Sequence, residues 1–345
     1  MINLKNVSIT PEMLNIIAEV DEFKGSWNSS EQSPDKYKHL KKVATIESIG
    51  SSNRIEGNTL TDKQVETILS NIKKQSFATR DEQEVAGYAE LMEDIFENYE
   101  VIPFNENHIK QLHKILLSYS DKDERHRGEY KTLANSVAAF DANGKEIGVV
   151  FETATPFETP AKMRELVQET KEQMEDRLIH PLIAIGLFVV HFLAIHPFQD
   201  GNGRMSRALT TLLLLQNGYL YVPYSSMESI IEENKASYYQ ALRNSQKTFK
   251  TSDIRYDYWL NFFLRTVQKQ VRRLKQKMSQ TVTGLGLTES KIISLFDSKN
   301  QWTTQEIADT LNMNIATVKK AIGEMVKKNY LTKNGSTRGA WYEKK

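Results

Sequence analysis

Residues 181–217 read PLIAIGLFVVHFLAIHPFQDGNGRMSRALTTLLLLQN, which is two apolar runs on either side of a polar, glycine-rich loop. The first run predicts a helix over Pro181–Ile195, which is too short to span a bilayer and is typical of a protein core. The second run predicts a helix over Gly203–Asn217, and Gly218 is placed to end it as a C-cap. The sequence therefore predicts two long helices joined by the loop.

The loop and the start of the second helix suit the binding of a polyphosphate. Gly201 and Gly203, on either side of Asn202, let backbone N–H groups approach an anion closely, and a helix N-terminus adds partial positive charge. Arg204 and Arg207 are three residues apart and therefore project from one face of the helix. Two guanidinium groups above a nest of N–H groups predict a triphosphate site.

Two further side chains of the loop add chemistry to this site. Asp200 is the natural ligand for a Mg²⁺ ion that bridges phosphates, because magnesium prefers one or two carboxylates together with substrate oxygens. His196 lies at the mouth of the loop and can accept a proton from an incoming hydroxyl near neutral pH. A zinc site at His196 and Asp200 is disfavoured, since Gly-Asn-Gly and two arginines fit phosphate better.

The rest of the chain up to about residue 278 is dominated by leucine, isoleucine and alanine at helical spacing. We predict helices over residues 35–49, 62–72 and 107–118, with Thr61 as the N-cap of the second. The one β signal is residues 136–151, two short apolar stretches around Asn143-Gly144, a pair that favours a tight hairpin turn. The predicted fold class is all-α with one β-hairpin.

The last sixty residues follow a separate pattern. A small, polar segment at 279–286 predicts a linker. Helices are expected over 289–297, 304–311 and 315–328, followed by an apolar-polar alternation around Asn334-Gly335. This order is typical of a winged helix-turn-helix domain, which we predict at residues 287–345.

The charges of this C-terminal segment leave its partner open. Lys319 and Lys320 fall on the expected recognition helix, and Lys333 and Arg338 fall in the wing, as in helices that contact DNA. Glu306 and Glu324 dilute the positive charge, and no residue is a compelling base reader. DNA binding and protein binding both remain alternatives for this domain.

Composition excludes several classes of protein. A net charge of +1 over 345 residues gives no global attraction to nucleic acid or to a membrane. The absence of cysteine excludes disulfides, thiolate catalysis and cysteine-bound zinc, and it is compatible with a reducing cytoplasm. The N-terminal residues lack the basic-then-apolar pattern of a signal peptide, so we expect a cytoplasmic protein without membrane association.

The loop resembles the signature of the Fic family, His-Pro-Phe-x-(Asp/Glu)-Gly-Asn-Gly-Arg-x-x-Arg, and all nine of its fixed positions are present. The resemblance covers roughly residues 35–270 and implies an adenylyltransferase, which moves AMP from ATP to a Ser, Thr or Tyr hydroxyl of a protein. The roles that it implies are a general base at His196, a Mg²⁺ ligand at Asp200, an anion hole at Gly201, Asn202 and Gly203, and phosphate clamps at Arg204 and Arg207.

Ser52-Asn-Arg-Ile-Glu56-Gly57 resembles the inhibitory motif of the same family, (Ser/Thr)-x-x-x-Glu-(Gly/Asn). This resemblance implies that the Glu56 carboxylate pairs with Arg207, so that ATP is bound in an unproductive position. The hairpin at 136–151 resembles the family's flap, which pairs with an extended segment of the target protein as an added strand.

Two other segments resemble family features more loosely. Tyr239 and Gln246 lie in a region that packs around adenine in relatives, so we expect them to contact ATP. Gly128-Glu-Tyr-Lys131 resembles a loop that often ends in arginine, and the sequence assigns no role to the lysine. His191 interrupts an apolar helix and is expected in the core. The other histidines lack metal-ligand spacing and are expected at the surface or in the core: His39, His108, His113, His126 and His180.

The resulting hypothesis is a protein adenylyltransferase with three parts. These are an N-terminal helical region with the inhibitory motif (1–100), a catalytic core (101–278) and the winged helix (287–345). We expect self-modification as well as a separate protein target, and the sequence leaves open a homodimer. One alternative is AMP removal in the same site, with Glu56 orienting a water molecule. The other is a DNA-binding regulator that keeps the core as a nucleotide sensor.

Overall fold

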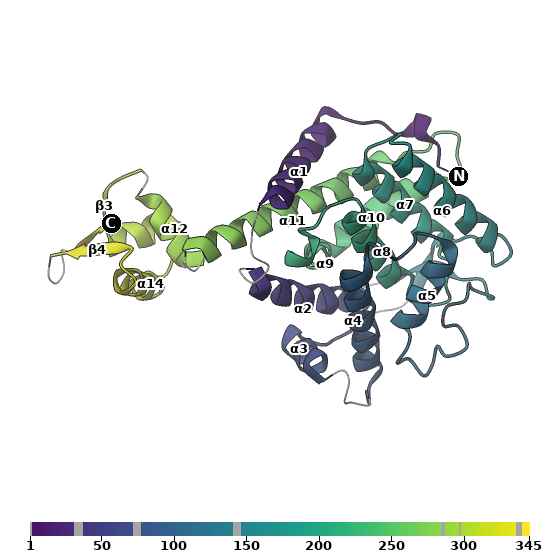
Figure 1. The fold of residues 1–345 in the computed structure, drawn as a ribbon, viewed down its shortest axis with the longest axis horizontal. Helices are drawn as coiled ribbons and strands as arrows, with labels where there is room; N and C mark the ends of the chain where they lie inside the picture. The colour runs from purple at the N-terminus through teal and green to yellow at the C-terminus, as the bar shows by residue number, and fades with distance from the viewer. Residues whose placement is uncertain are drawn as a thin grey trace. The chain divides into compact units, whose positions relative to one another are not determined.

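A computed structural model of the chain describes residues 2–30, 37–71, 77–140, 146–283, 287–296, 298–335 and 340–345. The chain forms two compact units, Met1–Arg272 and Arg273–Lys345 (Figure 1). Among the described residues, no helix combines the length and the hydropathy that crossing a bilayer requires.

The first unit is built almost entirely of helices, with short 3₁₀ turns at Leu4–Asn6 and Val222–Tyr224 (Figure 1). The predicted helices at 62–72, 107–118, 181–195 and 203–217 are confirmed to within two residues at each end. The helices are α1 Pro11–Ser29, α2 Lys38–Ile55, α3 Asp62–Asn71, α4 Arg80–Asn98, α5 Glu106–Leu116, α6 Thr159–Glu175, α7 Pro181–Ile195, α8 Asn202–Gln216, α9 Met227–Glu233, α10 Lys235–Gln246 and α11 Asp257–Thr283, whose last residues belong to the second unit.

Helix α7 is buried on all sides and organises the unit. It begins at Pro181, and the preceding His180 caps it, because its Nδ1 accepts the Leu182 N–H at 3.3 Å. Helices α6, α8 and α10 pack around it. At Gly186 the missing side chain lets α11 approach, since a Cβ there would lie 2.8 Å from a methyl group of Leu260. The core therefore fixes the end of α7 from which the glycine-rich loop departs.

Helix α2 is longer than the sequence predicts. The expected helix ends at residue 49, whereas α2 continues to Ile55, so most of the predicted inhibitory motif is helical. Ser51, Ser52 and Asn53 are weak helix formers, but all three are buried where α2 packs against α4, α8 and α9. The Asn53 side-chain N–H₂ donates to the Ile49 carbonyl at 2.8 Å, inside the helix. Tertiary packing has overridden the local preference.

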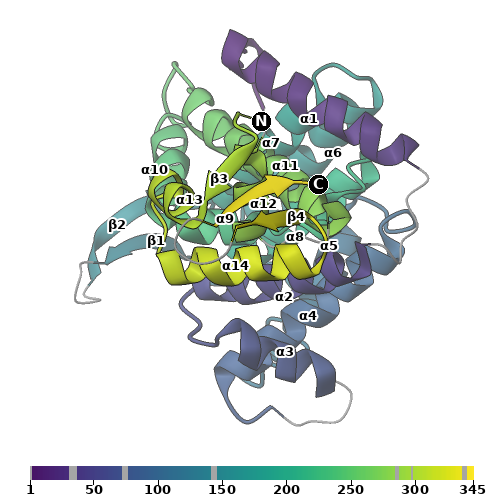
Figure 2. The ribbon, with the colours of Figure 1, turned by 90° about the vertical axis from the view of Figure 1, so that its left-hand side faces the viewer.

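The predicted hairpin is confirmed as an antiparallel pair, β1 Ser136–Phe140 and β2 Glu146–Glu152. The register shifts twice along the pair. The expected Asn143-Gly144 turn lies outside the described residues. Figure 2 shows the two strands as a ribbon at the edge of the helical body.

Within its described residues, the second unit combines the end of α11 and further helices with a small antiparallel sheet in the order β3-β5-β4. The predicted linker at 279–286 is wrong in part, because α11 remains helical to Thr283; residues 284–286 lie outside the described residues. Lys333 lies on the strand Leu331–Asn334, and Arg338 is outside the described residues. The elements are α12 Leu287–Leu295, β3 Gln301–Thr303, α13 Thr304–Leu311, α14 Ile315–Lys327, β4 Leu331–Asn334 and β5 Trp341–Lys344.

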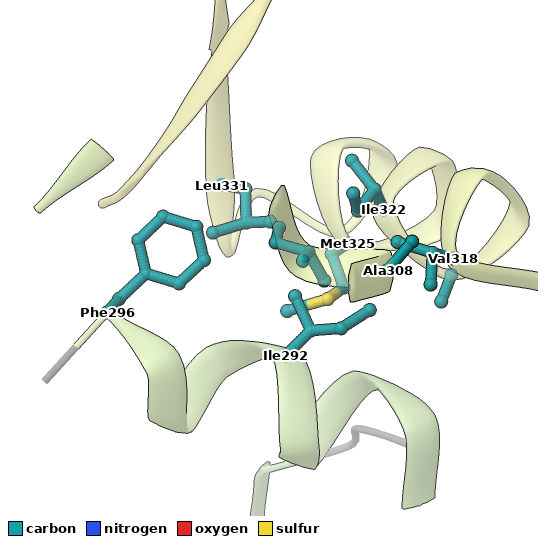
Figure 3. Close-up of a cluster of buried hydrophobic side chains, with 9 residues drawn as sticks. Ile292, Phe296, Ala308, Val318, Ile322, Met325 and Leu331 are labelled. Atoms are coloured by element: carbon teal, nitrogen blue, oxygen red, sulfur yellow. The ribbon is translucent and has the colours of Figure 1, made fainter. Parts of the chain in front are cut away.

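The core of the second unit lies between α12, α13 and α14 (Figure 3). Ile292 of α12 and Phe296, which directly follows this helix, pack against Ile322 and Met325 of α14, and Leu331 of β4 closes one side. A capping box fixes the start of α13, since Thr303 and Glu306 exchange side-chain and backbone hydrogen bonds. Helices α13 and α14 are separated by three residues, which is the spacing of a helix-turn-helix.

Candidate functional site

His196 ends α7 in a left-handed backbone conformation, with φ +54°. Its N–H donates to the Phe192 carbonyl at 2.8 Å, which completes the last turn of the helix. A residue other than glycine adopts this conformation only when its surroundings hold it there, and such residues concentrate at functional sites. The chain therefore presents this imidazole at a fixed, constrained turn.

The surroundings of His196 keep its imidazole uncharged. Burial lowers the pKa of His196 to about 4, and the positive charge of Lys131 acts in the same direction. The Leu193 backbone and the carboxylates of Glu56 and Asp200 oppose this shift without cancelling it. At neutral pH the ring can therefore accept a proton, as a general base must.

The loop after His196 is closed by Asn202. Its side-chain oxygen accepts the Phe198 N–H at 2.9 Å, and its N–H₂ group donates to the Phe198 carbonyl at 2.8 Å. Asn202 and Phe198 are both buried. The side chain of Asn202 thus makes its hydrogen bonds inside the loop. The group of Asn202 that can bind an anion is its backbone N–H.

His113 of α5 binds the loop through a hydrogen bond and a ring contact, a role that the sequence did not indicate. Its Nδ1 accepts the Gly128 N–H at 3.1 Å, so its Nε2 carries the proton and donates to the Asp200 carbonyl at 3.0 Å. Its ring stacks on Phe198 with 3.7 Å between centroids. Burial lowers the pKa of His113 to about 4. The only signal in the sequence was a histidine on the apolar face of a predicted helix.

Gly201, with φ +80°, is the N-cap residue of α8. It has no side chain that could accept a hydrogen bond from the first N–H groups of the helix. These N–H groups are therefore open to an external acceptor. Arg204, in the first turn, is 2% exposed. Within the described residues its Nε and Nη1 have no hydrogen-bond acceptor. Buried guanidinium donors without acceptors are uncommon, and an anionic ligand would supply them.

Four charged side chains form a closed ring beside this helix start. Arg80 Nε lies 2.8 Å from Glu84 Oε1, and Glu84 Oε2 lies 3.5 Å from Arg204 Nη1. Asp200 closes the ring, with its oxygens 3.6 Å from Arg204 and 3.5 Å from Arg80. Helix α4 thus contributes Arg80 and Glu84, which the sequence did not single out.

The Asp200 carboxylate is held in its ionised form. Burial acts to raise the pKa of Asp200, but Arg204, the Gly201 N–H at 2.6 Å and Arg80 together hold it below its usual value. An ionised carboxylate oxygen is the kind of ligand that a phosphate-bound Mg²⁺ needs. The described residues contain no group of three or more His, Asp or Glu side chains arranged to hold a metal by themselves.

Arg207 contacts Glu56 across the site, as the sequence predicts. Its Nη2 lies 2.8 Å from Glu56 Oε1, and Ser52 accepts from Nε and Nη2 through its hydroxyl and its carbonyl, each at 2.8 Å. The side chain of Arg207 is 4% exposed, whereas that of Glu56 is 32% exposed. Burial disfavours the charged guanidinium, but Glu56 and nearby tyrosines keep the pKa of Arg207 above its usual value.

The Glu56 carboxylate also lies against the start of α8. A Cβ added at Gly203 would collide with the carboxylate, so only glycine leaves room for it there. Glu56 therefore lies beside the first turn of α8 while it holds Arg207. A negative charge is favourable near the N-terminus of a helix, where an anionic ligand would also bind.

Arg54 fixes the end of α2 from which Glu56 projects. Its Nε and Nη2 form a bidentate pair with Glu232 of α9, at 2.7 and 3.0 Å. Its Nη1 contacts Asp62 at 2.9 Å and donates to the Leu60 carbonyl at 3.0 Å. The chain on both sides of Glu56 is thus tied to one guanidinium, which sequence reasoning did not identify.

The two residues expected near adenine lie in different surroundings. Tyr239 is half-buried, and the charges of Glu56 and Arg207 both act on its pKa, so it belongs to the same site. Gln246 is 5% exposed, and its amide donates to the Val190 carbonyl at 3.3 Å, which ties α10 to α7. The structure therefore brings Tyr239 to the site and uses Gln246 within the core.

Part of the chain is similar in sequence to known proteins. Residues 103–214 match the sequence profile of the Fic/DOC family. The chain is 26% identical over 234 residues to the protein adenylyltransferase Fic of Drosophila willistoni, which covers 66% of this chain and 42% of that protein. It is 30% identical over 100 residues to a probable protein adenylyltransferase of Aquifex aeolicus, 29% of this chain and 28% of that one.

Among solved structures, a Fic family protein from Desulfovibrio desulfuricans has a similar fold, with a TM-score of 0.62 and 22% identity over 99% of this chain and 98% of that chain. The chain matches less than half the length of the Drosophila relative and less than a third of the Aquifex one. The profile match includes the whole glycine-rich loop and both flanking helices except for two residues of α8. Residues 103–214 thus match the Fic/DOC family, and the chain is distantly similar to protein adenylyltransferases.

Proposed function

We propose that the protein transfers AMP from ATP to a Ser, Thr or Tyr hydroxyl of a protein, including its own chain, and that Glu56 restrains this activity. The observation that carries the proposal is the arrangement around the start of α8. A neutral imidazole, an ionised carboxylate and two buried arginines converge there, and one of the arginines is held by Glu56.

In the proposed reaction the triphosphate lies against the α8 N–H groups and Arg204. The Nε and Nη1 donors of Arg204 need acceptors, and phosphate oxygens supply them. The hydroxyl of the target approaches His196, whose Nδ1 is buried and whose Nε2 therefore takes the proton. The hydroxyl oxygen bonds to the α-phosphorus as the bond to pyrophosphate breaks, and His196 later returns its proton to solvent.

Asp200 is the residue that would hold the magnesium ion. Its ionised carboxylate is one oxygen ligand, and a single protein ligand suits a metal that takes most of its ligands from phosphates and water. When bound, the ion would neutralise part of the negative charge that develops on the leaving pyrophosphate. Binding also requires Asp200 to give up its contacts with Arg80 and Arg204. These contacts are long for ion pairs, at 3.5 and 3.6 Å.

Glu56 restrains transfer because it competes for the same space and the same cation as the triphosphate. Arg207 can clamp a phosphate only when its Nη2 is released from Glu56. The Glu56 carboxylate also repels any anion that approaches the α8 N–H groups at Gly203. ATP that binds while Glu56 is in place is therefore expected to present its α-phosphate in the wrong position for attack.

The position of Glu56 also keeps AMP removal as a second function of the site. The charge of Glu56 acts on the pKa of His196, so the two groups belong to the same site. In that reaction Glu56 orients a water molecule toward the AMP phosphorus and takes its proton, and the departing hydroxyl oxygen takes a proton that His196 has first gained from solvent. Loading and release of AMP, compared in Mg²⁺ and in Mn²⁺, separate the two functions.

We also propose that residues 287–345 act as a winged helix that recruits a partner. Helices α13 and α14 follow each other in a helix-turn-helix, and Lys319 and Lys320 are exposed on α14. A duplex DNA and an acidic protein surface both suit this face. One alternative form of this proposal has no catalysis. In it the protein is a regulator that binds DNA in response to ATP and transfers no AMP.

The deciding experiment compares wild type with Glu56→Gly in labelled ATP, with and without cell lysate. Glu56→Gly should raise self-modification by roughly tenfold or more, about 1.4 kcal/mol in activation free energy. The double variant Glu56→Gly with Arg207→Ala should lose that gain, because the freed guanidinium is what binds the phosphate. Glu124→Gly removes an exposed carboxylate of another loop and serves as the control.

Equal labelling by wild type and Glu56→Gly across a range of ATP concentrations would rule out the restraint. Absence of label in every variant, with ATP still bound, would argue against AMP transfer itself. Mass spectrometry of the labelled bands then identifies the modified hydroxyl and the target protein.

A further inference from the structure

We propose that Lys131 is a positioning residue that joins the base of the β1–β2 hairpin to the backbone that carries His196. The inference rests on the proposed AMP transfer and adds to it a physical link between the docking of the target and the general base. The sequence assigns no role to this lysine.

Lys131 is buried, at 3% exposure, and all three N–H donors of its ammonium are used. Nζ donates to Asn135 Oδ1 at 2.7 Å, to Thr153 Oγ1 at 2.9 Å and to the Ile195 carbonyl at 2.9 Å. An ammonium has three donors and no acceptor, so this set satisfies it completely.

The first two acceptors lie at the base of the hairpin. Asn135 directly precedes β1, and Thr153 directly follows β2. The Thr153 hydroxyl is 2.7 Å from both the side-chain oxygen and the carbonyl of Asn135, so the two ends of the hairpin are already joined there. Lys131 binds this junction as a unit.

The third acceptor is the last residue of α7, next to His196. The Ile195 carbonyl is among the C-terminal carbonyls that lack a partner within an α-helix, and a cation at a helix C-terminus is favourable. Two more hydrogen bonds reach the other side of His196. The Lys131 N–H donates to the Pro197 carbonyl at 2.8 Å, and the Asn135 side chain donates to the Phe198 carbonyl at 2.9 Å.

His196 is therefore held from both sides by one short segment, residues 131–135. The carbonyls at 195, 197 and 198 all accept from it, which explains how the strained φ of His196 is maintained. An extended target segment that pairs with the hairpin would act on Asn135 and Thr153, and through Lys131 on the position of the imidazole.

The burial of this charge has a cost that an apolar side chain would avoid. Burial lowers the pKa of Lys131 to about 8, with Lys162 acting in the same direction and Glu158 against it. Within the described residues the acceptors of Nζ are all neutral oxygens. A buried cation without a contacting carboxylate is retained where its contacts matter more than the stability it costs.

The phosphate site lies on other elements, and this separation makes the inference testable. Arg204 and Arg207 belong to α8, and Glu56 follows α2. Removing the Lys131 ammonium should therefore slow the transfer step and leave ATP affinity unchanged. A general loss of structure would weaken both together.

The experiment uses full-length Glu56→Gly protein as the parent, because its higher expected self-modification allows a decrease in rate to be measured. Lys131→Met keeps the length of the side chain and removes the donors, and it should lower the single-turnover rate of transfer by roughly tenfold or more. ATP affinity, measured by calorimetry, should stay within about twofold of the parent. Lys131→Arg should restore much of the rate, because it keeps several donors and the charge. Lys110→Met is the control, since Lys110 pairs with Glu129 at 2.7 Å on the surface of α5.

Amide hydrogen exchange gives a readout that does not depend on catalysis. Lys131→Met should speed exchange in residues 152–155 and 193–199, and Lys110→Met should not. Unchanged transfer and unchanged exchange in Lys131→Met would overturn the inference, as would an equal loss of ATP affinity and rate. A parent that exchanges as expected but transfers no AMP would refute the proposed function and leave the link itself intact.

Discussion

His196 combines a constrained backbone with an uncharged ring, and each property can be tested separately. His196→Ala removes the base and should lower self-modification in the Glu56→Gly parent by roughly 10²–10⁴-fold. ATP affinity should remain near that of the parent, because the proposed phosphate contacts belong to α8. Single-turnover transfer and calorimetry on the same preparation make the comparison. Transfer at the parent rate would show that another group takes the proton.

The buried histidines predict a loss of stability in mild acid. In the unfolded chain His113 takes up a proton near its ordinary pKa of 6.5, whereas in the folded protein it stays neutral down to about pH 4. The unfolded state therefore binds more protons in this window, and the free energy of unfolding falls as pH drops from 6.5 to 4.

His113→Leu should make this fall shallower, although it lowers stability at neutral pH by removing two hydrogen bonds. Urea unfolding at several pH values between 4.5 and 7 measures the slope, with the exposed His39→Leu as control. An unchanged slope in His113→Leu would mean that His113 is already protonated in the folded state.

Sequence reasoning at the residue scale located the loop and the segment at 52–57, because the members of each motif lie close in sequence. The Glu56–Arg207 contact was implied by the family resemblance alone. It assigned no role to His113, Arg54 or Lys131, which act through partners that only the fold brings near. Arg54 meets Glu232, 178 positions away, and Lys131 meets Ile195, 64 positions away. No spacing rule connects such residues.

Among the elements, α2 decides where Glu56 lies, and Arg54 decides where α2 ends. Arg54→Ala should loosen the last turn of α2 and raise self-modification several-fold, less than Glu56→Gly does. Adding Glu56→Gly should leave no further gain from Arg54→Ala, because the two changes act on one restraint. Arg265→Ala breaks an exposed pair between α11 and α1, at 2.7 Å, and is the matched control.

Hydrogen exchange over residues 50–56 checks the cause of the gain. Faster exchange in Arg54→Ala, together with higher labelling, fits the restraint. A drop in labelling would show that Arg54 supports catalysis and not inhibition.

Helices α7 and α8 were predictable almost to the residue because their apolar runs, caps and flanking glycines agree. The length of α2 was not, since its last turn contains serine and asparagine, whose local preference is for caps and turns. Burial against α4, α8 and α9 keeps them helical, and a single sequence does not display that packing. The linker expected at 279–286 was wrong in part, because polar residues there continue α11 to Thr283.

The whole molecule divides its proposed tasks between two units. Every residue assigned to AMP transfer lies in Met1–Arg272, so deleting residues 287–345 should leave self-modification within about twofold of wild type. Retention of duplex DNA or of a protein partner from lysate should be lost. A truncated protein with a normal melting transition and no transfer would reveal a coupling between the units.

Because the chain is synthesised from its N-terminus, the sequence separation of Glu56 and Arg207 sets the order in which the two residues are made. The two residues are 151 positions apart, and α2 leaves the ribosome long before α8 does. When Arg207 emerges and α8 folds into place, the carboxylate that holds it is already present. Under the proposed function, a nascent chain therefore has no interval in which its nucleotide site is complete and its restraint is still to be made.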